Sequence, residues 1–228
     1  MKRLFCLQKD SFAMFKIAPS ILAADFLHLE KDIELVNRCG DIIHLDVMDG
    51  TLVPNISFGF SVIDQLHKVA VAPMDAHLMV VHPERWFKKL SEDKVQMCSF
   101  HYEAAGADTS KYIAQIKSLG MKAGVAINPD IPVEKLFPYI GEADYFLLMS
   151  VFAGFGGQKF IYESLDRASC LKSEISRRGA EALIEMDGGI NMTTVKCARE
   201  AGVNIAVAGS SVYGAEDPEA AIAALREA

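Results

Sequence analysis

Short apolar runs rich in β-branched residues alternate along the chain with longer segments of helical periodicity. The apolar runs predict strands at residues 17–22, 42–47, 74–79, 97–102, 122–127, 145–151, 182–186 and 204–208. Apolar positions spaced by three and four predict amphipathic helices between them, for example at 26–39, 110–119, 164–178, 192–201 and 218–227. Eight such units in one chain of this length favour an α/β fold, a single (β/α)8 TIM barrel, over an open doubly wound sheet.

No linker rich in Pro, Gly or Ser and no break in composition divides these units. The first residues, MKRLFCLQKDSFAMF, lack the long apolar core and the small-residue cleavage site of a signal peptide. We therefore expect residues 1–15 to form a disordered N-terminal extension and residues 16–228 to form the barrel, which carries any catalytic site.

Composition narrows the choice of partners and compartment. A net charge of −7 and a pI near 5.4 argue against a nucleic-acid-binding protein, which normally has a basic surface. The longest uncharged run is too short to cross a membrane. The five cysteines are scattered without a CxxC pair, as in reduced cytoplasmic proteins. Apolar helix faces leave room for a homo-oligomer.

Two predicted strands carry ionisable residues at alternate positions, where side chains share one face. On one strand His44 and Asp46 share a face with Met48, and on the next Asp75 and His77 share a face with Met79. In barrels of this type, catalytic groups lie at the carboxyl ends of the strands. The polar residues at the predicted strand ends are Ser20, His44, Asp46, His77, His101, Glu103, Asn128, Asp187 and Ser210.

A buried histidine taken singly is more often a hydrogen-bonded core residue than a metal ligand. His44 and His77 together, with Asp46 and Asp187 at other strand ends, favour a divalent metal ion, Zn, Fe, Mn or Co. Asp75 lies nearer the middle of its strand, so we expect it to stay outside the ligand set. Met48, Met79 and Met149 are typical core residues that could also line a cavity.

Three glycine-rich segments follow the last three strands, namely GFGG (154–157), DGG (187–189) and AGSS (208–211). Glycine lets backbone N–H groups approach an anion without a Cβ in the way. The loops after strands seven and eight form the usual phosphate site of this architecture. Three such segments in succession therefore predict a phosphate-binding cradle that needs no basic side chain.

These segments together resemble the ribulose-phosphate 3-epimerase family over the region from about Lys16 to the end of the chain. The motifs that carry the resemblance are APSILAADF (18–26), HLDVMDG (44–50), VPN (53–55), DAHLM (75–79), GFGGQ (154–158) and EMDGG (185–189). The resemblance implies metal-dependent C3 epimerisation of D-ribulose 5-phosphate to D-xylulose 5-phosphate, a step of the pentose phosphate pathway, through an enediolate.

The resemblance also implies a role for each matching residue. One divalent metal ion would be bound by His44, Asp46, His77 and Asp187. Asp46 and Asp187 would form the catalytic acid/base pair, each serving one face of the substrate. The phosphorylated ketose would contact Ser20, Met48, His77, Met79 and Met149. Its phosphate would be bound by Gly154, Phe155, Gly156, Gly157, Gly188, Gly189, Gly209 and Ser210.

One pair of residues departs from the family pattern. The family usually has an acidic or amide residue and a proline before Gly154, where this chain has Phe152 and Ala153. We expect loss of the proline to loosen the turn that enters the phosphate loop.

Three other functions compete with this interpretation. A D-allulose-6-phosphate 3-epimerase would share the architecture, and a non-catalytic sugar-phosphate-binding barrel would share the cradle. The second has no need of two opposed carboxylates. A synthase or decarboxylase would need a lysine at a strand end, where neither Lys122 nor Lys159 is well placed.

Overall fold

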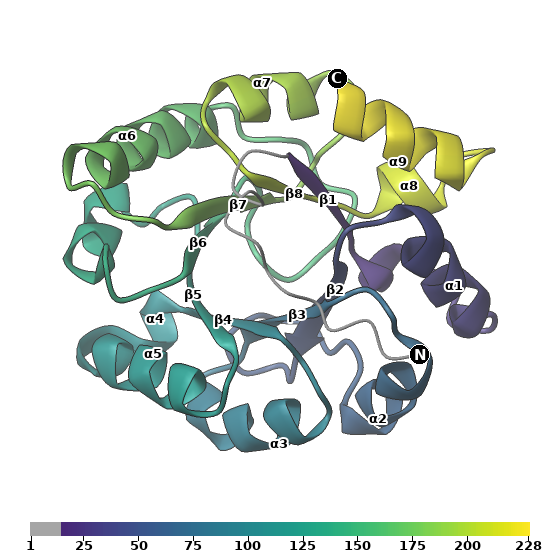
Figure 1. Cartoon of the computed structure of the whole chain (residues 1–228), viewed down its shortest axis with the longest axis horizontal. Coiled ribbons are helices and arrows are strands. Elements are labelled where there is room, and N and C mark those ends of the chain that lie inside the picture. The colour runs from purple at the N-terminus through teal and green to yellow at the C-terminus, as the bar shows by residue number, and fades with distance from the viewer. Residues whose placement is uncertain (1–14) are drawn as a thin grey trace.

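The structure is a computed structural model that describes residues 15–228, and it contains an eight-stranded parallel sheet curled into a barrel (Figure 1). The strands are β1 (Lys16–Pro19), β2 (Ile43–Met48), β3 (Met74–Met79), β4 (Met97–His101), β5 (Lys122–Ile127), β6 (Tyr145–Met149), β7 (Leu183–Asp187) and β8 (Ile205–Ala208). From β2 to β8 each strand pairs in parallel with the next, and β8 also pairs with β1. The predicted (β/α)8 barrel is confirmed.

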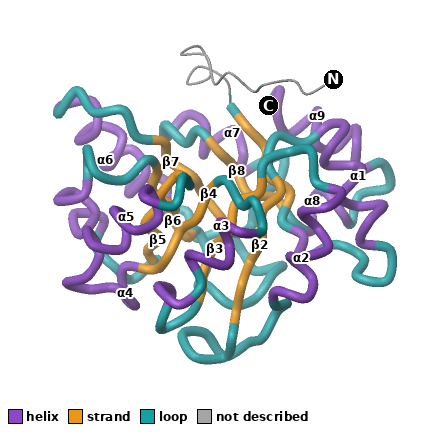
Figure 2. Tube along the Cα trace, turned by 60° about the horizontal axis from the view of Figure 1, so that its bottom comes forward, coloured by secondary structure: helices purple, strands orange, loops and turns teal. Residues whose placement is uncertain are grey.

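Helices surround the strands on the outside, and long loops extend at one end of the barrel (Figure 2). The helices are α1 (Leu29–Cys39), α2 (Phe60–Val69), α3 (Phe87–Glu92), α4 (Tyr102–Ala105), α5 (Thr109–Ser118), α6 (Glu163–Arg177), α7 (Thr194–Glu200), α8 (Ser210–Tyr213) and α9 (Pro218–Glu227). A 3-10 helix, Val133–Tyr139, stands between β5 and β6. No helix within residues 15–228 is both long and apolar enough to span a bilayer.

The barrel closes between β1 and β2 with little backbone pairing. Just beyond the end of β1, Ser20 forms an isolated parallel bridge with His44 of β2. The closing seam thus lies at the strand ends, where the sequence places its polar residues. The bridge between Ser20 and His44 therefore places the end of β1 beside β2 at this seam.

The core has an outer and an inner part. The outer part fills the space between strands and helices with apolar side chains, such as Ile33, Phe87 and Leu171. The inner part plugs the barrel interior near the strand beginnings with Ala18, Ile42, Met97, Tyr145, Ile205 and Val207. Because this plug fills the amino-terminal end, the interior is accessible from outside at the carboxyl ends of the strands.

Some element boundaries differ from the prediction. Helix α1 begins at Leu29 instead of residue 26, because Asp25 makes a turn instead of a helix cap. Its Oδ1 accepts from the Leu27 N–H at 3.0 Å, and its Oδ2 lies 2.8 Å from His28 Nδ1. Of the expected extension, residues 1–14 lie outside the described residues, and the Phe15 ring lies 4.4 Å from the Arg199 guanidinium.

Candidate active site

Four side chains predicted as metal ligands converge at the carboxyl ends of three strands. His44 and Asp46 share one face of β2, and the β2–β3 register places Asp46 beside His77. Asp187 is the last residue of β7 and reaches the same point from across the barrel. One possible ligand atom from each of the four lies within 4.8 Å of the others.

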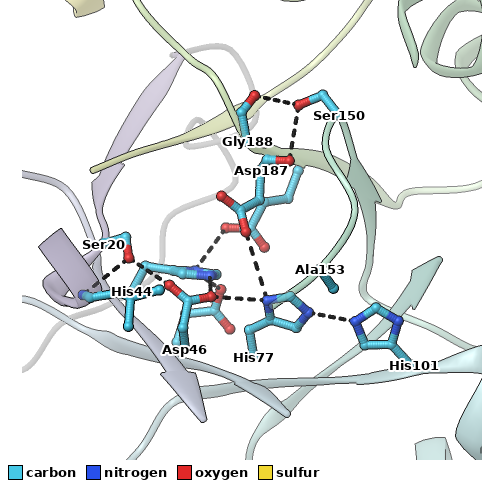
Figure 3. Close-up of polar contacts among 12 residues, drawn as sticks. Ser20, His44, Asp46, His77, His101, Ser150, Ala153, Asp187 and Gly188 are labelled. Carbon is cyan, nitrogen blue, oxygen red and sulfur yellow. Dashed lines mark hydrogen bonds and ion pairs between the residues drawn. The ribbon is translucent and has the colours of Figure 1, made fainter. Parts of the chain in front are cut away.

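The contacts within this group are short and polar, as Figure 3 shows. Asp46 Oδ1 lies 3.4 Å from His44 Nε2 and 3.2 Å from His77 Nδ1, and Asp187 Oδ2 lies 3.8 Å from His77 Nδ1. His44 Nε2 is fully buried and has no hydrogen-bond partner. A buried lone pair without a partner is costly, whereas a cation at this point would use it. Two imidazoles and two carboxylates fit a divalent transition metal.

The pKa values of the two aspartates are shifted in opposite directions. Burial raises the pKa of Asp46, but the positive charge of His44 and the hydrogen bond with His77 outweigh it and hold that pKa far below its usual range. Burial and the neighbouring Asp46 carboxylate raise the pKa of Asp187 to about 7. The site therefore pairs a carboxyl group that readily ionises with one that holds its proton up to about neutral pH.

Below His44, a second polar group fills the barrel interior. Asp75 Oδ2 lies 3.1 Å from His44 Nδ1, and the Tyr145 hydroxyl donates to Asp75 Oδ1 at 2.6 Å. Glu185 Oε1 lies 3.7 Å from His44 Nδ1, and burial together with the Asp75 carboxylate raises the Glu185 pKa well above its usual range. Asp75 thus lies under His44, outside the four-residue group, which leaves His44 Nε2 to face that group.

The sequence prediction missed Glu185 and Tyr145, and it assigned no role to His101, which contacts His77. A signal existed for Glu185, because residues 185 and 187 lie two apart and share one face of β7. Tyr145 had no such signal, since a tyrosine at the start of a strand is ordinary. Its ring occupies space that a Cβ at Gly124 on β5 would fill.

A cavity of about 330 Å³ opens above the two aspartates. The predicted substrate-binding residues that line it are Ser20, Met48, Met79, Met149, Gly154, Phe155, Gly156, Gly157, Gly188, Gly209 and Ser210. His44 and His77 are buried beneath it. Gly189 lines a neighbouring cavity of about 570 Å³ instead. The prediction missed the lining residues Leu22, Ala23, Val151, Phe152, Gln158 and Val207.

The loop after β6 supplies most of the glycines at the cavity mouth. Gln158 Nε2 donates to the carbonyls of Phe152 and Phe155 at 2.7 and 2.8 Å, which folds the loop back on itself. Asn55 Nδ2 donates to the Gly154 carbonyl at 2.7 Å. The turn that enters this loop was expected to be loose without a proline. It is held by a further hydrogen bond, in which the Ala153 N–H donates to Asn128 Oδ1 at 2.9 Å.

The sequence profile of the ribulose-phosphate 3 epimerase family matches residues 16–213, most of the chain. The chain belongs to this family. It is 44% identical over 211 residues to the ribulose-phosphate 3-epimerase of Mycobacterium tuberculosis H37Rv, covering 92% of this chain and 91% of that protein. It is 42% identical over 215 residues to the Bacillus subtilis 168 enzyme, covering 93% and 99%. Family membership makes the chain an isomerase.

Other comparisons concern location and fold. A relative from Oryza sativa subsp. japonica, 38% identical over 94% of each chain, is named as a cytoplasmic isoform of ribulose-phosphate 3-epimerase. Among solved structures, KGPDC from Streptococcus mutans aligns with a TM-score of 0.69 at 12% identity, covering 94% of this chain and 96% of that one. A 3-hexulose-6-phosphate synthase aligns with a TM-score of 0.65 at 19% identity, covering 94% and 98%. At these identities the structures show a shared barrel fold.

Proposed function

We propose that this chain interconverts D-ribulose 5-phosphate and D-xylulose 5-phosphate, a step of the pentose phosphate pathway, by moving a proton at C3. The observation that carries the proposal is that Asp46 and Asp187 converge from opposite strands and both line the cavity, and their pKa values are shifted in opposite directions. The names of the relatives support the same substrate. A phosphorylated sugar also suits a cavity with glycine-rich loops at its mouth.

The two aspartates divide the proton transfer between them. The C3 proton is acidified by the neighbouring C2 carbonyl, so an ionised carboxylate within reach can remove it. Asp46 is the carboxylate in that state, and Asp187 then delivers its own proton to the opposite face of the resulting enediolate. The reverse reaction exchanges the two roles. Ser20 Oγ donates to Asp46 Oδ2 at 2.5 Å and so fixes the orientation of Asp46.

The four converging side chains would hold one divalent metal ion, Zn, Fe, Mn or Co, and they are His44, Asp46, His77 and Asp187. When bound, such an ion acts as a Lewis acid that polarises a carbonyl and stabilises developing negative charge. The donor atoms fit the ion without rearrangement of the backbone, because they already lie within 4.8 Å of one another. His44 contributes Nε2, since its Nδ1 faces Asp75.

The remaining cavity residues bind and enclose the substrate in this proposal. Backbone N–H groups of the glycine loops bind the phosphate, since no Cβ blocks the approach. Met48, Met79 and Met149 are almost fully buried beside the aspartates and exclude water from the reacting carbons. Exclusion of water matters because it strengthens the electrostatic interactions that the aspartates make.

The assay for this proposal compares two phosphorylated ketoses with the same metal-loaded protein. NMR detection of the C3 epimer gives initial rates for D-ribulose 5-phosphate and D-allulose 6-phosphate. We expect kcat/KM to favour the pentulose phosphate by about tenfold or more, as one extra carbon in a shaped cavity allows. Faster turnover of the hexulose phosphate would overturn the substrate assignment. Absence of turnover with both would indicate a non-catalytic sugar-phosphate-binding barrel.

Location and assembly are part of the same proposal. The four cysteines in the described part of the chain are free thiols, which supports a reducing cytoplasmic location, as does the name of the rice relative. Exposed apolar side chains at Leu27, Ile56 and Val71 support a homo-oligomer. Cell fractionation tests the location, and light scattering on the purified protein tests the assembly.

A further inference from the structure

A row of buried polar groups leads away from the proposed metal site through His77. His77 Nε2 lies 2.9 Å from His101 Nε2, and both rings are fully buried and stacked with centroids 5.0 Å apart. His101 Nδ1 in turn lies 3.4 Å from Glu103 Oε1. If His77 Nδ1 binds a cation, its Nε2 carries the proton and donates to His101, which then donates to Glu103 (Figure 3 shows the two histidines).

Glu103 accepts hydrogen bonds from Asn128 as well as from His101. Its Oε1 accepts from the backbone N–H of Asn128 at 3.0 Å and from Asn128 Nδ2 at 2.9 Å. Burial raises the pKa of Glu103, but the hydrogen bond with His101 and that from Asn128 outweigh it and hold the pKa below its usual value. Glu103 is therefore an ionised acceptor held from two sides.

Asn128 continues the row to the loop after β6. Its side-chain amide is used at both ends, because Nδ2 donates to Glu103 while Oδ1 accepts from the Ala153 N–H at 2.9 Å. Ala153 directly precedes Gly154, the first glycine at the cavity mouth. Neither Glu103 nor Asn128 lines the cavity, so any effect of either on the substrate passes through other residues.

We propose that Glu103 and Asn128 are positioning residues that connect the proposed metal site with the phosphate loop. Glu103 fixes the tautomer and ring orientation of His77 through His101, as carboxylates do for histidine ligands of metals. Asn128 fixes the entrance of the loop after β6 through the Ala153 amide. The inference rests on the proposed function, because it concerns the same metal site and the same phosphate loop.

Two substitutions act on opposite ends of the row. Glu103→Gln removes the negative charge next to His101 while keeping the size and an acceptor oxygen. Asn128→Leu removes the Oδ1 that accepts from the Ala153 N–H, and the matched variant Asn128→Asp keeps an acceptor oxygen at that place. Each protein, checked for folding by circular dichroism, is titrated with Co²⁺ against a chelator to obtain a Kd and is assayed for KM and kcat with D-ribulose 5-phosphate.

We expect Glu103→Gln to weaken Co²⁺ binding by about 10- to 100-fold, the range typical of residues that orient metal ligands. We expect Asn128→Leu to raise KM by about tenfold while the Co²⁺ Kd stays within about threefold, because the Asn128 backbone N–H still donates to Glu103, and we expect Asn128→Asp to raise KM less than about threefold. A merely structural role would lower the melting temperature of both variants without separating their effects on metal affinity and KM.

The outcomes separate this inference from the proposed function. Wild-type protein that bound no Co²⁺ would overturn both the metal site and the inference. Wild-type protein that bound Co²⁺ with the same Kd as Glu103→Gln would overturn the inference alone. Equal KM values for Asn128→Leu and Asn128→Asp would remove the phosphate-loop half of it, and this result does not depend on whether Glu103→Gln folds.

Discussion

At the scale of single residues, His44 presents its two ring nitrogens to different surroundings. Nδ1 faces Asp75, whose other oxygen accepts from the Tyr145 hydroxyl, and Nε2 faces the proposed metal site without a hydrogen-bond partner. We predict that Asp75→Asn weakens metal binding by about 10- to 100-fold, because the charge that fixes the His44 tautomer is lost. Chelator competition measures this Kd.

The control for Asp75 is Tyr145→Phe, which removes only the hydroxyl that donates to Asp75. We expect metal affinity to change by less than about threefold, because the Asp75 charge remains. Urea unfolding should show a loss of about 1–3 kcal/mol, since a buried carboxylate oxygen loses its donor. An unchanged metal Kd for Asp75→Asn would contradict the role given to His44.

The raised pKa of Asp187 predicts how turnover depends on pH. Asp187 must carry a proton to deliver it to the substrate, and it loses that proton as the pH rises through its pKa of about 7. At constant metal content, kcat/KM should therefore be level below pH 7 and fall about tenfold per pH unit above it. Initial rates at a series of pH values on both sides of pH 7 measure this slope, and a level profile well above pH 7 would count against Asp187 as the proton donor.

At the scale of elements, the turn after β7 depends on a glycine with an unusual backbone. Gly188 has a φ of +116°, and a Cβ there would collide with the Val151 side chain. Gly156, in the loop after β6, has open space around the position of a Cβ and no such φ. We predict that Gly188→Ala costs about 2 kcal/mol or more in urea unfolding, and Gly156→Ala less than about 1 kcal/mol. Equal losses in the two variants would show that a side chain at residue 188 causes no particular strain.

Strands were predicted more closely than the helices and turns around them. Almost all strand residues are buried, on both faces of the sheet, so a strand can be recognised from a few consecutive residues. Strands β3 and β5 begin and end as predicted. The start of α1 was wrong, because Asp25 suits a turn as well as a helix cap. The choice between these two structures depends on tertiary packing, which a local pattern does not contain.

At the scale of the whole molecule, one carboxylate joins the first strand of the barrel to its last helix. Asp41 Oδ2 accepts from the Ile17 N–H of β1 at 2.9 Å and from Arg226 Nε and Nη2 of α9 at 3.1 and 3.0 Å. We predict that Asp41→Ala lowers the free energy of unfolding by about 2–3 kcal/mol, because a charged acceptor shared by two residues is lost. Activity per folded molecule should stay unchanged, since Asp41 does not line the cavity.

The control for Asp41 is Arg38→Ala. Arg38 forms an ion pair of 3.9 Å with Glu219, in which both side chains are well exposed. Such pairs contribute little, so urea unfolding should change by less than about 0.5 kcal/mol. A similar loss in both variants would show that surface charge, and not the junction between β1 and α9, sets the stability.

The convergence of the proposed metal ligands was predictable because the barrel converts sequence order into position. Once eight units close, the carboxyl ends of β2, β3 and β7 must face one ring, so His44, His77 and Asp187 meet. The buried residues that contact these side chains from behind, His101 and Tyr145 among them, were not predictable in the same way. Whether His101 contacts His77 or Tyr145 contacts Asp75 depends on ring orientations across the barrel. The division of the glycine loops between two cavities, which separates Gly189 from Gly188, is equally non-local.

The central claim is that Asp46 and Asp187 move a proton at C3 of the substrate. The transfer of hydrogen from solvent to that carbon tests the claim most directly. D-ribulose 5-phosphate in D₂O is incubated with wild-type protein and with Asp187→Asn, each at the same measured metal content, and the formation of D-xylulose 5-phosphate with deuterium at C3 is followed by NMR. We predict rapid formation of this product with the wild type and a loss of at least about 100-fold in Asp187→Asn, with inorganic phosphate still bound, because Asp187 delivers the hydrogen to the face opposite Asp46. Formation of deuterated D-xylulose 5-phosphate at the wild-type rate in Asp187→Asn would contradict the claim.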